Sequence, residues 1–218
     1  MAYLKEGDVI LFQGDSITDG NRGRTEDPNH ILGHGYQFLL ACDMACDNLG
    51  VDATFINRGI SGHRISDLFG RWNEDALLLN PTVLSILVGI NDIGFEYDNH
   101  LPADPMRFER IYRLILEESL AKNPELILVI MEPFFVLLDD SERSHFFDER
   151  TRALAVICKK LAEEYHAVYV PLQDMFDSYI GRIPTAQLLW DGVHPTFVGH
   201  GLLAARWKEC VIPVLENR

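Results

Sequence analysis

Residues 9–20 have the sequence VILFQGDSITDG, a short apolar run followed by a turn that contains Ser16. The uninterrupted apolar run Val9–Phe12 is typical of a strand that is buried on both faces. Gly14 allows a sharp turn after this strand, so that the Ser16 hydroxyl can be held facing a cleft. Such a turn can present a nucleophile, or it can present backbone N–H groups to a phosphate. Residues elsewhere in the chain distinguish these two uses.

Segments of strand character alternate with segments of helical spacing along the rest of the chain. Further strands are predicted at residues 51–56, 82–88, 126–131 and 167–170. Helical spacing of apolar residues is found within residues 36–49, 65–79, 108–115, 154–165 and 197–211. The apolar faces of these helices include Cys46, Leu49 and Phe197, and loops are expected at residues 21–33, 91–105 and 132–147. The α/β alternation predicts a five-stranded parallel sheet covered by helices on both faces, within a single domain that spans residues 1–218.

Charge and hydrophobicity restrict the kinds of partner that we expect. The formal net charge is −14, and 47% of the residues are hydrophobic, which is ample for a core. This charge would repel a nucleic-acid backbone or an anionic membrane, and no cluster of Lys and Arg offsets it. No window approaches the ~20 apolar residues of a membrane helix, and the first apolar run is too short for a signal peptide. We therefore expect a cytoplasmic protein with a small-molecule substrate, no nucleic acid and no membrane.

The cysteines give no sign of a disulfide framework or of a metal site. They are Cys42, Cys46, Cys158 and Cys210, which are too few and too scattered for a set of disulfides. Cys42 and Cys46 lie four residues apart on a predicted helix, but no His or Cys pair stands near them to complete a zinc site. We expect cysteines packed on helices, and neither a metal nor a cofactor.

Small or polar residues follow three of the predicted strands. These residues are Ser16, Gly59 and Asn91. Because the carboxyl ends of parallel strands meet at one edge of a sheet, we expect all three to line one site. The Gly59 N–H can face a ligand with no side chain in the way, and the Asn91 carboxamide can donate to the same point. With the Ser16 N–H they could surround an oxyanion, although Gly59 could also simply end a strand and Asn91 could cap a helix.

A second informative stretch, Asp191-Gly192-Val193-His194-Pro195, lies near the other end of the chain. A nucleophilic serine needs a base within hydrogen-bond reach, and that base needs a group that fixes its tautomer. A carboxylate three residues before a histidine can fold back onto Nδ1 and leave Nε2 to face Ser16. The pair of Asp191 and His194 favours the interpretation of Ser16 as a nucleophile, because a phosphate-binding loop would leave both residues without a role.

Aromatic residues near these stretches are candidates for a substrate pocket. Trp190 precedes Asp191 directly, and it could form a wall of an acyl pocket or simply pack. Phe95, Phe134 and Phe135 fall in the loops expected after strands, where they could line the leaving-group side or join the core.

Four blocks of the sequence resemble, in order, the signature blocks of the SGNH (GDSL-type) hydrolases. The blocks are GDSITD at 14–19, NRGISG at 57–62, GIND at 89–92 and WDGVHP at 190–195. The resemblance implies a three-layer flavodoxin-like α/β fold and a catalytic triad of Ser16, His194 and Asp191. It also implies an oxyanion hole made by the Ser16 and Gly59 N–H groups and the Asn91 side chain, with no cofactor.

A closer resemblance within that superfamily is to the intracellular acetyl-xylooligosaccharide esterases. It rests on RWNED at 71–75, GIND at 89–92 and LWDGVHPTFVGH at 189–200. It implies a cytoplasmic homo-oligomer that hydrolyses short-chain O-acyl esters of small carbohydrates, O-acetyl esters above all, through an acyl-enzyme. One scaffold and one triad serve many acyl substrates, so a lysophospholipase, a thioesterase or a general short-chain carboxylesterase is the alternative.

Overall fold

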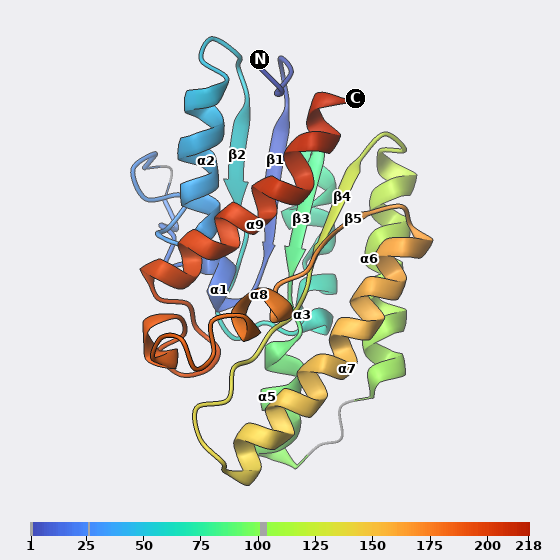
Figure 1. Ribbon diagram of the computed structural model, residues 1–218. Coiled ribbons are helices and arrows are strands. Elements are labelled where there is room, and N and C mark those ends of the chain that lie inside the picture. The colour runs from blue at the N-terminus through green and yellow to red at the C-terminus, as the bar shows by residue number, and fades with distance from the viewer. Residues whose placement is uncertain (1, 26, 101–103) are drawn as a thin grey trace.

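Uninterrupted apolar runs form the strands at the centre of the fold. The structure is a computed structural model that describes residues 2–25, 27–100 and 104–218 (Figure 1). Its sheet has five parallel strands in the order β2-β1-β3-β4-β5. The strands are β1 (Val9–Gly14), β2 (Thr54–Asn57), β3 (Val83–Leu87), β4 (Ile127–Met131) and β5 (Val168–Val170). The predicted five-stranded parallel sheet is confirmed.

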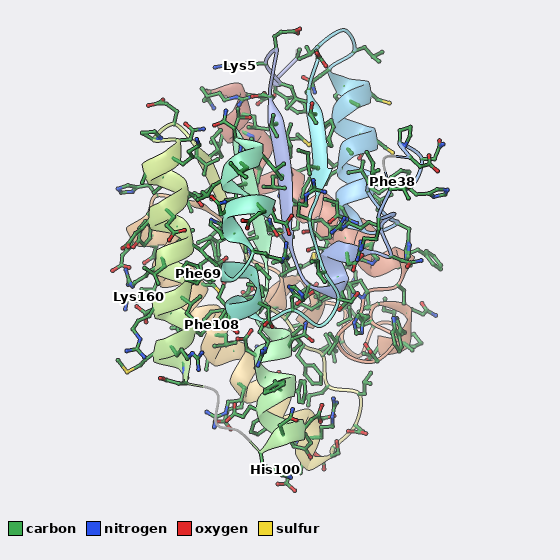
Figure 2. All side chains as sticks on the ribbon, turned by 180° about the vertical axis from the view of Figure 1, so that it is seen from behind. Lys5, Phe38, Phe69, His100, Phe108 and Lys160 are labelled. Atoms are coloured by element: carbon green, nitrogen blue, oxygen red, sulfur yellow. The ribbon has the colours of Figure 1, made fainter. Side chains whose placement is uncertain are left out.

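Helices cover both faces of this sheet and complete a three-layer α/β fold. One face packs against α2 (Tyr36–Asp47) and α9 (Phe197–Glu216), and α9 crosses in front of the strands in Figure 1. The other face packs against α3 (Ile65–Phe69), α4 (Trp72–Asp75), α6 (Pro105–Lys122) and α7 (Glu142–Glu164). Seen from behind, Phe69 and Phe108 lie among the helices of this second face, whereas His100 and Lys160 lie at the periphery (Figure 2). Short elements complete the chain, namely α1 (Ser16–Asp19), α5 (Ile90–Asn99), α8 (Gln173–Asp177), η1 (Leu77–Leu79) and η2 (Thr185–Gln187).

The two cores follow from the two-residue period of the strands. Phe12 in β1 points to the α2 and α9 side, while its neighbour Leu11 points to the opposite core. Buried indoles lie on both sides, and each donates its N–H to a serine hydroxyl at 3.0 Å, Trp207 to Ser85 and Trp72 to Ser119. These bonds remove the cost of burying an indole N–H without an acceptor.

Two of the predicted loops are wrong, because each contains part of a helix. The stretch predicted as a loop at 91–105 contains most of α5, which starts after Gly89 and buries only Ile90 and Ile93. Two inward residues are too few to give a periodic signal in the sequence. The loop predicted at 132–147 ends earlier, because the Ser141 side chain accepts a hydrogen bond from the Ser144 N–H and starts α7 at Glu142.

The continuous helix predicted at 65–79 is also wrong. The segment forms α3, α4 and η1, with Gly70 at the end of α3. Glycine has a low helix propensity, and the separate pieces still bury Ile65, Leu68 and Trp72 against the sheet. The periodic pattern therefore identified the buried face but not the break.

Three residues expected on apolar helix faces point to solvent instead. Phe197 is 89% exposed at the first position of α9, Leu49 is 85% exposed beyond the end of α2, and Cys46 is exposed. Phe197 and Leu49 lie at or beyond helix ends, where a residue is no longer held against the sheet. None of the helices within the described ranges combines the length and the apolarity that a membrane crossing requires.

Candidate active site

Ser16, His194 and Asp191 form a hydrogen-bonded series at the carboxyl edge of the sheet. Ser16 is the first residue of α1, directly after β1, and its Oγ lies 2.8 Å from His194 Nε2. His194 Nδ1 lies 2.7 Å from Asp191 Oδ2. The histidine and the serine are 178 residues apart in sequence. Both side chains are thus at the distances that a base and a nucleophile require.

The segment 190–194 is held by its own hydrogen bonds. The second carboxylate oxygen, Asp191 Oδ1, accepts the N–H groups of Val193 at 3.0 Å and His194 at 2.7 Å. The Trp190 N–H donates to the His194 carbonyl at 3.1 Å, which closes the turn. Gly192 is required in this turn, because its φ is +84° and a Cβ would lie 2.7 Å from the Val136 carbonyl oxygen. One carboxylate therefore orients both the imidazole and the backbone that carries it.

Two carboxyl groups near Ser16 have opposite pKa shifts. Burial tends to raise the pKa of Asp191, but the hydrogen bonds from His194 and the Val193 N–H bring it below its usual value, so the group is a carboxylate. Burial raises the pKa of Asp15 to about 7, against the opposing effects of the Ile17 N–H and of His194. Asp15 caps α1 by accepting that Ile17 N–H at 3.0 Å and so holds the turn before the helix.

The expected oxyanion donors differ in what they contact. The Ser16 N–H is at the first position of α1, where an amide has no acceptor within the helix. Asn91 lies in the first turn of α5, and its Nδ2 donates one of its two hydrogens to the His63 carbonyl at 3.1 Å. The Gly59 N–H donates to Asn57 Oδ1 at 2.8 Å. A Cβ on Gly59 would lie only 2.3 Å from the Asp19 nitrogen, so this position also serves the close packing of the turn on α1.

Asn57 organises this part of the site, and the sequence analysis gave it no role. Its buried side chain donates to the carbonyls of Thr18 at 2.7 Å and Leu32 at 2.8 Å, while its Oδ1 accepts the Gly59 N–H. It therefore ties the end of β2 to α1 and to the loop that follows α1. The signal for this role in the sequence is an asparagine that directly follows the predicted strand 51–56 and stands two residues before Gly59.

The aromatic candidates occupy different positions. The Trp190 indole stacks on the His194 imidazole, with ring centroids 5.2 Å apart and planes at 16°, and it is 62% exposed. Phe95 lies under the Arg64 guanidinium, 4.2 Å from its centre, and lines a separate cavity. Phe134 and Phe135 are buried, so of the two roles left open for them the structure shows core packing.

The described residues do not form a cluster that could bind a metal ion. Within residues 2–25, 27–100 and 104–218, no three side chains of His, Cys, Asp or Glu lie close enough together to hold a metal ion. The chemistry that the site can perform without one is proton transfer from Ser16 to His194, followed by attack of the serine oxygen on an electrophilic carbon.

Comparisons with known proteins find a matching family and similar solved structures. The sequence pattern of the GDSL-like lipase/acylhydrolase family matches residues 12–202. An acetylxylan esterase from Geobacillus stearothermophilus is 30% identical over 206 residues, which cover 92% of either chain. A candidate GDSL-like lipase from Parabacteroides merdae has a similar solved structure, with a TM-score of 0.90, 32% identity and coverage of 97% of this chain and 98% of that one. A catalytic mutant of Axe2, an acetylxylan esterase from Geobacillus stearothermophilus, gives a TM-score of 0.84 at 28% identity, covering 96% and 95% of the two chains.

Proposed function

The chain belongs to the GDSL-like lipase/acylhydrolase family and is a carboxylic ester hydrolase, and we propose that it removes short acyl groups, acetyl above all, from the hydroxyl oxygens of small carbohydrates. The observation that carries the mechanism is the hydrogen-bonded series from Asp191 through His194 to Ser16. The substrate class is supported by the similarity to an acetylxylan esterase over most of both chains.

In the proposed reaction, Ser16 is the nucleophile and His194 is the base. Nε2 accepts the Oγ proton across the 2.8 Å hydrogen bond as Oγ attacks the ester carbonyl. The imidazolium then gives this proton to the leaving sugar oxygen, and the acyl group stays on Ser16. A water molecule that loses its proton to the same nitrogen hydrolyses this acyl-enzyme and releases the carboxylic acid.

The negative charge on the carbonyl oxygen needs donors that are already in place. The Ser16 N–H and the second hydrogen of Asn91 Nδ2 supply two of them. The Gly59 N–H becomes a third donor when it shares its hydrogen between the oxyanion and Asn57 Oδ1, which it contacts in the unliganded site. A shared hydrogen contributes less than a fully directed one. We therefore assign Asn91 a larger share of the oxyanion stabilisation than Gly59.

Substitution of Asn91 by alanine tests this assignment. We expect kcat for nitrophenyl acetate to fall by roughly 10²- to 10³-fold, the effect of losing one oxyanion donor. The matched control is Asn99→Ala in the same helix, since Asn99 is exposed and donates only locally, to the Phe95 carbonyl at 3.1 Å. Melting temperatures of both variants show whether the loss of the Asn91 bond to His63 has disturbed the fold. A wild-type kcat in a folded Asn91→Ala variant would rule out this residue as a donor.

A series of esters tests the substrate class. We expect the highest kcat/KM for acetyl esters, a lower value for butyrate and a much lower value for octanoate, together with release of acetate from acetylated xylose oligomers. The measurement is nitrophenol release for the nitrophenyl esters and acetate release for the sugars. Preference for octanoate would contradict the deacetylase and would support a lysophospholipase or a long-chain thioesterase instead.

A further inference from the structure

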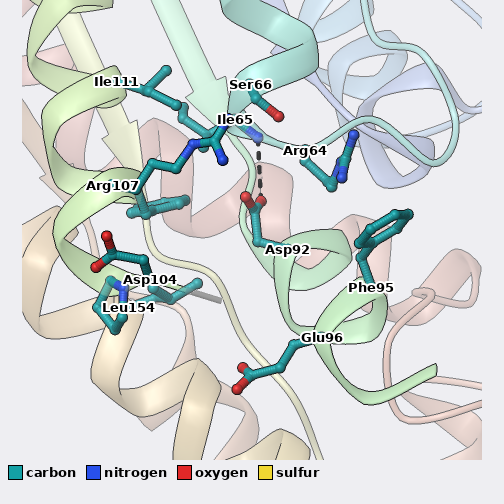
Figure 3. Close-up of a pocket in the computed structure, with 12 residues that line it drawn as sticks. Arg64, Ile65, Ser66, Asp92, Phe95, Glu96, Asp104, Arg107, Ile111 and Leu154 are labelled. Carbon is teal, nitrogen blue, oxygen red and sulfur yellow. Dashed lines mark hydrogen bonds between the residues drawn. The ribbon is translucent and has the colours of Figure 1, made fainter. Parts of the chain in front are cut away.

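A cavity that is not part of the triad lies beside α5, the helix that carries Asn91. It is a cavity of about 340 Å³ between α3, α5, the first turns of α6, and α7 (Figure 3), a volume within the range of pockets that bind small ligands. Ile65, Phe108 and Leu154 give it an apolar lining, while Asp92 and Arg107 bring polar groups to it.

Asp92, which lines the cavity, directly follows the proposed oxyanion donor Asn91 in the sequence. Asn91 and Phe95 are four residues apart and share one face of α5, and Asp92 lies on the adjacent face, toward the cavity. Both faces are tied to the same turn before α3. Asn91 Nδ2 donates to the His63 carbonyl at 3.1 Å, and Asp92 Oδ2 accepts the Ile65 N–H at 3.2 Å. The wall of the cavity at Asp92 is therefore tied to the same turn that positions Asn91.

Most charges around the cavity are already paired. The pairs are Arg64 with Asp67 at 2.9 Å, Glu96 with Arg150 at 3.5 Å, and Asp104 with Arg110 at 3.5 Å. Arg107 and Asp92 have no ion-pair partner among the residues that the structure describes. Figure 3 shows the Arg107 guanidinium and the Asp92 carboxyl turned toward the same space. Both groups can therefore contact a ligand in this space.

The two groups without an ion-pair partner have opposite charges. An anion would face the carboxyl of Asp92, and a cation would face the guanidinium of Arg107. A hydroxyl group both donates and accepts, so one polyol can accept from the guanidinium and donate to the carboxyl. The C–H faces of a sugar ring can pack on the apolar lining, as apolar ligand surface does in most pockets.

We propose that this cavity is a subsite for the neutral, polyhydroxylated part of the substrate, namely sugar rings beyond the acetylated unit. The proposal rests on the carbohydrate esterase function proposed above. The Arg64–Phe95 stack lines the cavity on the helix face that Phe95 shares with Asn91, and it offers a flat surface on which a sugar ring can lie.

The test compares an ester with several sugar rings and an ester with none. Ile111→Trp fills the cavity from α6, and Arg107→Ala removes the guanidinium. We expect the ratio of kcat/KM for acetylated xylotriose to that for nitrophenyl acetate to fall about tenfold or more in each variant, because a hydrogen bond to a charged group is lost or its space is occupied. The fall should come from a higher KM for the sugar ester.

Direct binding gives a second readout. Unacetylated xylotriose is titrated calorimetrically into the Ser16→Ala protein and into the same protein with Arg107→Ala added. We expect the affinity to weaken about tenfold in the double variant. Arg107 is exposed, so we expect Arg107→Ala to fold. This variant therefore tests the subsite even if Ile111→Trp does not fold.

Matched controls lie on the same helix and are not among the residues that line the cavity. Leu114→Trp adds an indole at an exposed position one turn from Ile111, and Met106→Ala truncates an exposed side chain next to Arg107. Both should keep the wild-type ratio. An unchanged ratio in both cavity variants, or equal xylotriose affinity with and without Arg107, would overturn the subsite. A wild-type enzyme that hydrolyses nitrophenyl acetate but not acetylated xylotriose would contradict the proposed function itself, and lack of xylotriose binding to Ser16→Ala would overturn the subsite as well.

Discussion

Replacing Ser16 with alanine is expected to lower kcat for nitrophenyl acetate by roughly 10⁴- to 10⁶-fold, as removal of a triad nucleophile does in other serine hydrolases. Without Oγ no acyl-enzyme can form, and His194 has no hydroxyl to deprotonate. The residual rate comes from the oxyanion donors and from substrate positioning, which remain in the variant. Initial rates of nitrophenol release, with the wild type and the variant at equal concentration, measure the effect.

A second serine provides the matched control for this variant. Ser178 follows α8 and is exposed, and its Oγ donates locally to the Met175 carbonyl at 2.7 Å. Ser178→Ala should keep the wild-type rate. An organophosphate transfers its phosphoryl group to an activated serine and loses its leaving group, so the mass of the phosphoryl group should be added to the wild type and to Ser178→Ala, but not to Ser16→Ala. Wild-type turnover by Ser16→Ala, or labelling of that variant at another serine, would show that the nucleophile is a different residue.

The features that the sequence predicted well are those with a strong local signal. An uninterrupted run such as residues 9–12 has few alternatives to a strand buried on both faces. Once five strands alternate with helices, the parallel sheet follows, and the carboxyl ends of β1 and β3 must lie at one edge with the residues that come after them. The cytoplasmic location, the single domain and the homo-oligomer stay predictions.

The features that the sequence did not predict depend on contacts between distant segments. The break after Gly70 and the helix that starts at Ile90 are set by how the pieces fit against the sheet, which periodicity does not contain. The Gly59 N–H could be placed at the site from its position after a strand. Its direction toward Asn57 depends on a side-chain conformation that is fixed by the carbonyls of Thr18 and Leu32.

Trp190 shows the same difference between position and conformation. Its place in the sequence next to Asp191 made it a candidate for the substrate pocket. The sequence could not distinguish a wall of an acyl pocket from simple packing. In the structure it stacks on the imidazole of His194 while most of the indole remains exposed. The contact arises because the 190–194 turn closes on itself through the Trp190 N–H, which is a property of the turn and not of the residue type.

The second large effect is expected for Asp191→Asn, which should lower kcat by about 10⁴-fold while the protein stays folded. An asparagine can keep its Oδ1 toward the N–H groups of Val193 and His194, so the turn retains its backbone hydrogen bonds. Its NH2 group would then occupy the position of Oδ2, 2.7 Å from His194 Nδ1. Because an amide NH2 can only donate, Nδ1 must accept, and the imidazole proton moves to Nε2. In that tautomer Nε2 cannot take the Ser16 proton.

The pH dependence separates this tautomer effect from a simple loss of charge. The wild-type Asp191 has a pKa below the usual carboxyl value, so it is ionised throughout the neutral range and contributes no titration there. If the asparagine acted only by lowering the basicity of His194, the acid limb of the kcat/KM profile would move to lower pH and the plateau would recover. A wrong tautomer instead lowers the whole plateau, because the neutral imidazole carries its proton on Nε2 at every pH.

Full pH profiles of the wild type, Asp191→Asn and the exposed control Asp174→Asn on α8, each with its melting temperature, therefore identify how the carboxylate acts. An unchanged plateau in Asp191→Asn would mean that another group orients His194.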